Sequence, residues 1–163
     1  MATQVRLDGD RIRLADAVLV YLERTPALLE PVPSETAPRP YGVAPLAMTP
    51  GGDVVAALWP GEAVWLGFQA VDRAVTTQLQ IRLDDQTSQL SCPPDSSFVG
   101  RPIAGGRRLL GSESLDRFTL IALTSVPVVV NVQLVRPTEF TRLSGRIPTP
   151  PDPGQAFSGR RLP

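Results

Sequence analysis

Hydrophobic and polar residues alternate with a period of two along most of the chain, which is the pattern of β-strands. The clearest alternation is TTQLQIRL at 76–83, where Leu79 and Ile81 are expected to face a core while Gln78 and Arg82 face water. RFTLIALT at 117–124 and VPVVVNVQLVRP at 126–137 predict a strand pair in the same way. Pro127 belongs near the start of its strand, because proline cannot donate to a β-ladder.

The N-terminal third predicts a small hairpin followed by further strands. Two short apolar-alternating stretches flank the turn sequence DGD at 8–10, where Gly9 accepts a positive φ. VLVYLE at 18–23 favours a strand, with a short helix as the alternative. EAVWLGFQA at 62–70 is apolar on both faces and is therefore expected to be covered on both sides.

Two long segments interrupt these strands. Residues 25–52 hold many prolines, which fix φ and remove a donor, so we expect a long loop lying on the body in extended pieces. Residues 84–116 are rich in Ser, Gly, Pro and Asp and are expected to be irregular, with a tight turn at 104–107.

Together these patterns predict a single all-β domain over residues 1–136, built as an antiparallel β-sandwich of seven or eight short strands. A jelly roll is one topology that fits. No stretch keeps a clear helical period. Residues 137–163 are expected to form an extended proline-rich C-terminal arm.

The residue types absent from the chain change the functional picture. There is no histidine and no lysine, and Cys92 is the single cysteine. A Ser-His-Asp or Cys-His arrangement, a Schiff-base lysine and a Walker A lysine are therefore excluded, and a zinc site is not expected. We expect a protein that is not an enzyme and needs no cofactor, with Cys92 as a half-buried structural residue.

A ligand-binding role is the alternative hypothesis. Trp59 and Trp65 lie close together in the sequence and could stack on sugar rings, while Asp84 and Asp85 could supply oxygen ligands to calcium. Aromatic residues that flank a Pro-Gly turn more often pack in a hairpin, and acidic residues in turns more often cap backbone groups.

The C-terminal tail gives the main functional hint. Polyproline stretches have little backbone freedom left to lose on docking, and this tail also carries apolar anchors and arginines, which suit carboxylates. The candidate interaction residues of the arm are Phe140, Ile147, Phe157, Arg160, Arg161 and Leu162. The arm could dock on its own domain or on a neighbouring copy.

Charge supports protein partners rather than nucleic acid. The net charge is zero and no basic run is present, so no nucleic-acid footprint is expected. Residues 1–90 carry seven arginines against eleven acidic residues, whereas residues 91–163 carry nine against five. Copies could therefore attract one another. The expected partners are the protein itself or other protein subunits.

The sequence indicates neither a signal peptide nor a membrane span. With one cysteine, the expected location is the cytoplasm or a particle assembled inside the cell. The leading hypothesis is a non-enzymatic structural subunit that assembles through proline-rich arms, in the general style of bacterial or bacteriophage structural proteins. No motif is specific to one family.

Overall fold

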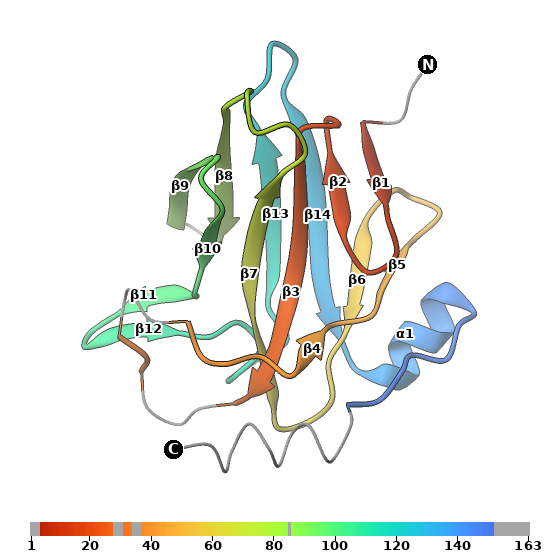
Figure 1. Cartoon of the computed structure of the whole chain (residues 1–163). Coiled ribbons are helices and arrows are strands. Elements are labelled where there is room, and N and C mark those ends of the chain that lie inside the picture. Colours follow the sequence, from red (N-terminus) through yellow and green to blue (C-terminus); the bar gives the residue numbers. More distant parts are fainter. Residues whose placement is uncertain (1–3, 28–30, 34–36, 85, 152–163) are drawn as a thin grey trace.

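A computed structural model describes residues 4–27, 31–33, 37–84 and 86–151 of the chain (Figure 1). This part is all-β apart from one short helix, and its strands form two six-stranded sheets and one two-stranded sheet. The sequence-based expectation of an all-β protein is confirmed.

The first six-stranded sheet is organised around the long pair β3 and β7, which are antiparallel from Val18 opposite Ala70 to Pro26 opposite Glu62. Its strands in spatial order are β1 (Val5–Leu7), β2 (Ile12–Leu14), β3 (Val18–Pro26), β7 (Glu62–Ala70) and β10 (Ser96–Phe98), with β4 (Gly42–Val43) also beside β3. The expected hairpin around DGD is β1–β2, and 18–23 is a strand rather than a helix.

The second six-stranded sheet contains the strands with the clearest alternation. Its spatial order is β5 (Leu46–Met48), β6 (Val54–Ala57), β14 (Val128–Val135), β13 (Arg117–Ala122), β8 (Thr77–Leu83) and β9 (Gln86–Cys92). The expected pairing of β13 with β14 is confirmed. The expectation of a purely antiparallel fold is wrong at one place, because β6 and β14 run parallel. These strands are far apart in sequence, so no local turn determined their direction.

One contiguous apolar cluster takes side chains from both six-stranded sheets. Leu22 and Leu66 enter it from the first sheet, and Leu79, Leu120 and Val132 enter it from the second. All five are at most 1% exposed. The period-two pattern therefore identified the buried face of these strands correctly.

The region 84–116 is more regular than the sequence indicates. It contains β9, β10 and a two-stranded sheet formed by β11 (Arg101–Ile103) and β12 (Gly106–Arg108). β9 lies at the edge of its sheet and is built largely from polar residues, which removes the hydrophobic signal of a strand. The tight turn was placed correctly, since Ile103 pairs with Gly106 across two intervening residues.

The expected extended arm begins as a helix, α1 (Pro137–Ser144). Proline is well placed at the first turn of a helix, where its missing N–H needs no partner. Gly145 ends the helix in the left-handed conformation and donates its N–H to the carbonyl of Thr141. α1 packs on the outer side of the second sheet, where Phe140 is fully buried beside Ala57 and Val135. With eight residues, it was too short to give a clear helical period.

Candidate functional site

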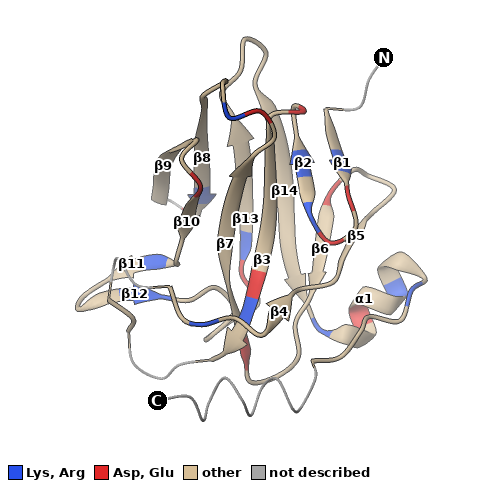
Figure 2. Cartoon of the chain, viewed as in Figure 1, with Lys and Arg blue, Asp and Glu red and all other residues tan. Residues whose placement is uncertain are grey.

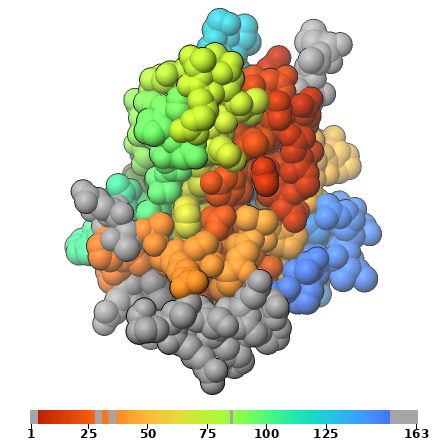
Figure 3. Space-filling model, viewed as in Figure 1, coloured from red at the N-terminus to blue at the C-terminus, as the bar shows by residue number. Residues whose placement is uncertain are grey.

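Five of the exposed large hydrophobic residues lie in or next to loops at one end of the fold. These loops are at the top of Figure 1. This end is formed by the β2–β3 turn (15–17), the β7–β8 loop (71–76) and the β13–β14 loop (123–127), and we call it the apical surface. In the space-filling view, the β13–β14 loop forms its tip (Figure 3). The large hydrophobic residues exposed there are Val71, Val75, Leu123, Val126 and, at the start of β14, Val129. Val126 is 76% exposed.

Two adjoining hollows lie between these exposed residues. The larger has a volume of about 740 Å³ and the smaller about 410 Å³, and Ala15, Thr124 and Ser125 line both. The larger hollow is otherwise lined mainly by apolar residues, among them Val5, Met48, Val126, Val128 and Val129. Surface concavity combined with exposed apolar side chains is typical of a binding surface.

Hydrogen bonds from one backbone amide and one side-chain hydroxyl connect the loops around the hollows. The amide of Val71 donates to the carbonyl of Ala17 at 2.9 Å and joins the β7–β8 loop to the β2–β3 turn. The hydroxyl of Thr124 donates to the carbonyl of Val126 at 2.7 Å within the β13–β14 loop. The loops that carry Val71 and Val126 are therefore connected by hydrogen bonds to neighbouring backbone groups.

The charges that line the hollows are acidic. Of the residues that the structure describes, Asp16 and Asp72 line the smaller hollow, and those that line the larger one are uncharged. Asp16 accepts a hydrogen bond from Arg13 Nε at 2.9 Å, which lowers the pKa of its carboxyl. Asp72 accepts the amide of Ala74, and among the described residues it forms no ion pair. The distribution of charges over the strands is seen in Figure 2.

The opposite end of the fold contains a buried polar cluster that the sequence analysis missed. Arg24 donates to both carboxylate oxygens of Glu62, at 3.0 and 3.1 Å, and the two residues are 5% and 4% exposed. Glu62 also accepts the Trp59 amide at 2.9 Å and the Tyr41 hydroxyl. The signal available in the sequence was an arginine and a glutamate on otherwise apolar strand faces.

This cluster also holds the root of the C-terminal arm. Arg24 Nη1 lies 3.5 Å from the carbonyl oxygen of Thr149, and Arg146 donates to the carbonyl of Leu46 at 2.9 Å. Residues 146–149, which we call the arm root, are therefore attached to the body of the same chain. Among the predicted arm residues, Phe140 is buried in this chain and Ile147 is 88% exposed. The others, Phe157, Arg160, Arg161 and Leu162, lie outside the described residues.

The two tryptophans proposed to bind a ligand lie in different places. Trp59 packs beside the α1 cluster, and the guanidinium carbon of Arg24 lies 5.0 Å from its ring centroid. Trp65 packs in a separate cluster on the outer side of β7 and donates its indole N–H to the carbonyl of Pro38 at 3.0 Å. Both rings are half-buried and in contact with groups of their own chain.

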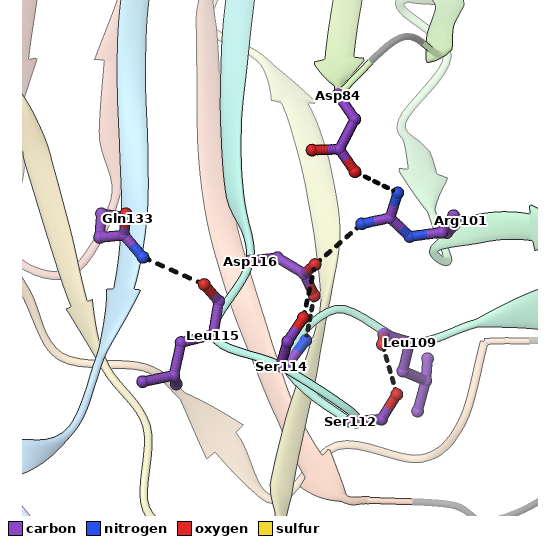
Figure 4. Close-up of polar contacts among 9 residues, drawn as sticks. Asp84, Arg101, Leu109, Ser112, Ser114, Leu115, Asp116 and Gln133 are labelled. Carbon is purple, nitrogen blue, oxygen red and sulfur yellow. Dashed lines mark hydrogen bonds and ion pairs between the residues drawn. The ribbon is translucent and has the colours of Figure 1, made fainter.

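The carboxylate proposed to bind calcium is part of an ion-pair network that braces two loops (Figure 4). Arg101 donates to Asp84 and to Asp116, each at 2.8 Å, and the bond that Asp84 accepts is the main reason that the pKa of Arg101 is raised. Asp116 also accepts the amide of Gly111 at 2.7 Å. Asp85 lies outside the described residues, among which no group of three potential metal ligands occurs.

No family model, curated protein or solved structure matches this chain. Within residues 4–151, apart from the undescribed gaps, no helix is long and apolar enough to cross a bilayer.

Cys92 is fully buried, more than the half-buried position expected, and burial raises the pKa of its thiol. The apical surface is thus the described feature with the clearest capacity to bind something.

Proposed function

We propose that the protein is a non-enzymatic assembly subunit that forms an oligomer or joins a larger protein complex. The observation that carries this proposal is the clustering of exposed hydrophobic residues around the hollows of the apical surface. Exposed apolar side chains favour burial, at roughly 25 cal/mol per Å² of area removed from water. An exposed apolar surface of this kind is typical of protein contact.

We infer that the scaffold is a two-layer β-sandwich. In support, one apolar cluster is shared by both six-stranded sheets, and α1 covers part of the outer side of one of them. The proline-rich segments are the proposed connectors. In support of that role, the arm root is attached to the body through Arg24 and Arg146, so that the chain beyond it starts from a defined point.

The proposal is tested by measuring the mass of the full-length protein under native conditions, by sedimentation velocity and native mass spectrometry. The native chain should form a species heavier than one 17.5 kDa protomer, and Val126→Asp should reduce it to a monomer. Val43→Asp is the matched control, because Val43 is also exposed but lies on β4, away from the apical surface. A native chain that is monomeric and captures no protein partner would refute the proposed function.

A further inference from the structure

We propose that the apical surface is the receptor for residues 152–163 of a second copy of this chain, so that copies join head to tail. This inference rests on the proposed assembly function and adds the identity of the two contacting surfaces. Its three supports are the position of the arm root, the chemistry of the tail and the chemistry of the hollows.

The arm root and the apical surface lie at opposite ends of the same strand. β3 (Val18–Pro26) starts next to the β2–β3 turn of the apical surface, and near its other end Arg24 contacts Thr149. Six residues of strand separate Val18 and Arg24, which corresponds to about 20 Å. The described chain therefore ends, at Pro151, close to the end of the fold that faces away from the hollows (Figure 1).

The sequence of the tail complements the hollows. Phe157 and Leu162 are the large apolar residues of DPGQAFSGRRLP, and Arg160 and Arg161 are its only cations. The larger hollow is mainly apolar, and the smaller one is lined by Asp16 and Asp72. Asp16 already pairs with Arg13 at 2.9 Å and Arg6 at 3.4 Å, whereas Asp72 forms no ion pair among the described residues. An apolar side chain can fill the first hollow while an adjacent guanidinium meets Asp72 in the second.

The tail is long enough to reach a second copy, and the position of the arm root favours that copy as the source. Twelve extended residues reach about 40 Å, enough to cross from one subunit to another stacked on it. To reach the hollows of its own subunit, the tail would have to turn back over the body by the length of β3. A contact between different surfaces of identical subunits is heterologous, so it continues into a ring or a filament instead of stopping at a symmetric dimer.

Two full-length variants each disable one of the two proposed contact surfaces. The arm variant carries Phe157→Asp and Leu162→Asp, and the receptor variant carries Val126→Asp; circular dichroism shows whether each is folded. Each variant alone should be monomeric. An equimolar mixture should form a dimer of twice the 17.5 kDa chain mass, because one intact arm then meets one intact apical surface and the chain cannot grow further.

A cross-linking experiment checks the contact directly. Full-length Val126→Cys and Leu162→Cys chains are mixed under mild oxidation, where the native Cys92 stays protected by burial. The expected product is a disulfide-linked dimer containing one of each chain. The matched control replaces Val126→Cys by Val43→Cys and should give no such product.

The outcomes distinguish this inference from the function beneath it. If the native protein assembles but the mixed variants stay monomeric, the head-to-tail contact is wrong and the assembly function stands. If the arm variant still assembles while Val126→Asp does not, the apical surface binds some other part of a protein. A double variant that carries both Val126→Cys and Leu162→Cys tests the alternative. If its disulfide forms only within the monomer, the tail binds its own subunit. A native protein that is monomeric overturns the head-to-tail contact, and one that also captures no protein partner overturns the proposed function as well.

Discussion

Replacing the carboxylate of Glu62 by an apolar group should cost the protein much of its stability. Glu62→Met removes an acceptor that binds Arg24 twice and also binds the Trp59 amide and the Tyr41 hydroxyl. Of the partners among the described residues, the buried guanidinium would then keep the carbonyl of Thr149, at 3.5 Å, and the rings of Trp59 and Tyr41.

The magnitude follows from burial. Removing one partner of a buried, hydrogen-bonded ion pair costs about 3–5 kcal/mol, because an uncompensated charge remains in a poorly solvated place. The two aromatic rings, at 5.0 and 5.8 Å from the Arg24 guanidinium carbon, flank this charge in the intact protein too, so they do not offset the loss. A loss of about 3 kcal/mol or more is a large part of the usual 5–15 kcal/mol or so for a domain.

Urea unfolding followed by circular dichroism measures this loss. With a slope of about 1–3 kcal/mol per molar urea, the midpoint should fall by about 1–3 M. The double variant Arg24→Met with Glu62→Met should be more stable than Glu62→Met alone, because it leaves no buried charge. A change below about 0.5 kcal/mol for Glu62→Met, the usual size for surface substitutions, would show that the pair is solvated and the reasoning wrong.

Three further predictions concern packing and pH. Phe140→Ala should lower the free energy of unfolding by about 3–5 kcal/mol, since the ring is fully buried under α1; a loss below about 1 kcal/mol in urea would show that the helix is not docked. Gly67→Ala should lower Tm, because its Cβ would lie 2.3 Å from the Tyr21 ring, and Tyr21→Ala should remove most of that cost; an unchanged Tm contradicts this close contact. Burial and the bond to Glu62 raise the pKa of Tyr41, so its contribution to the free energy of unfolding should be complete below about pH 10. Above that pH the contribution should fall, because the unfolded state loses the proton first. Urea unfolding repeated at alkaline pH should show a smaller fall in Tyr41→Phe, and an equal fall in both proteins would contradict this role.

Strands that bury one face in the shared core were predictable from the sequence. In β8 and β13, every second residue must be apolar, so Leu79 and Leu120 reveal both the strand and its orientation. β9 was missed because an edge strand needs little apolar character. The parallel pairing of β6 with β14 was missed because it depends on a connection of about seventy residues rather than on a turn.

The candidate site was less accessible to sequence reasoning. Val126 and Val128 belong to the same apolar run, yet one is 76% exposed and the other 6%. Only the position of the β13–β14 loop beyond the end of the core separates them. Arg24 and Glu62 stand 38 residues apart, and they become diagonal neighbours only through the register of β3 with β7.

That register also connects the two ends of the fold. The β3–β7 ladder carries the apical surface at one end and the Arg24–Glu62 pair, with the arm root, at the other. In the proposed head-to-tail assembly, this nine-residue ladder would set the distance between the donated arm and the apical surface within each copy. Loosening the Arg24–Glu62 pair should therefore weaken the donation of an arm while the apical surface of the same subunit still accepts one.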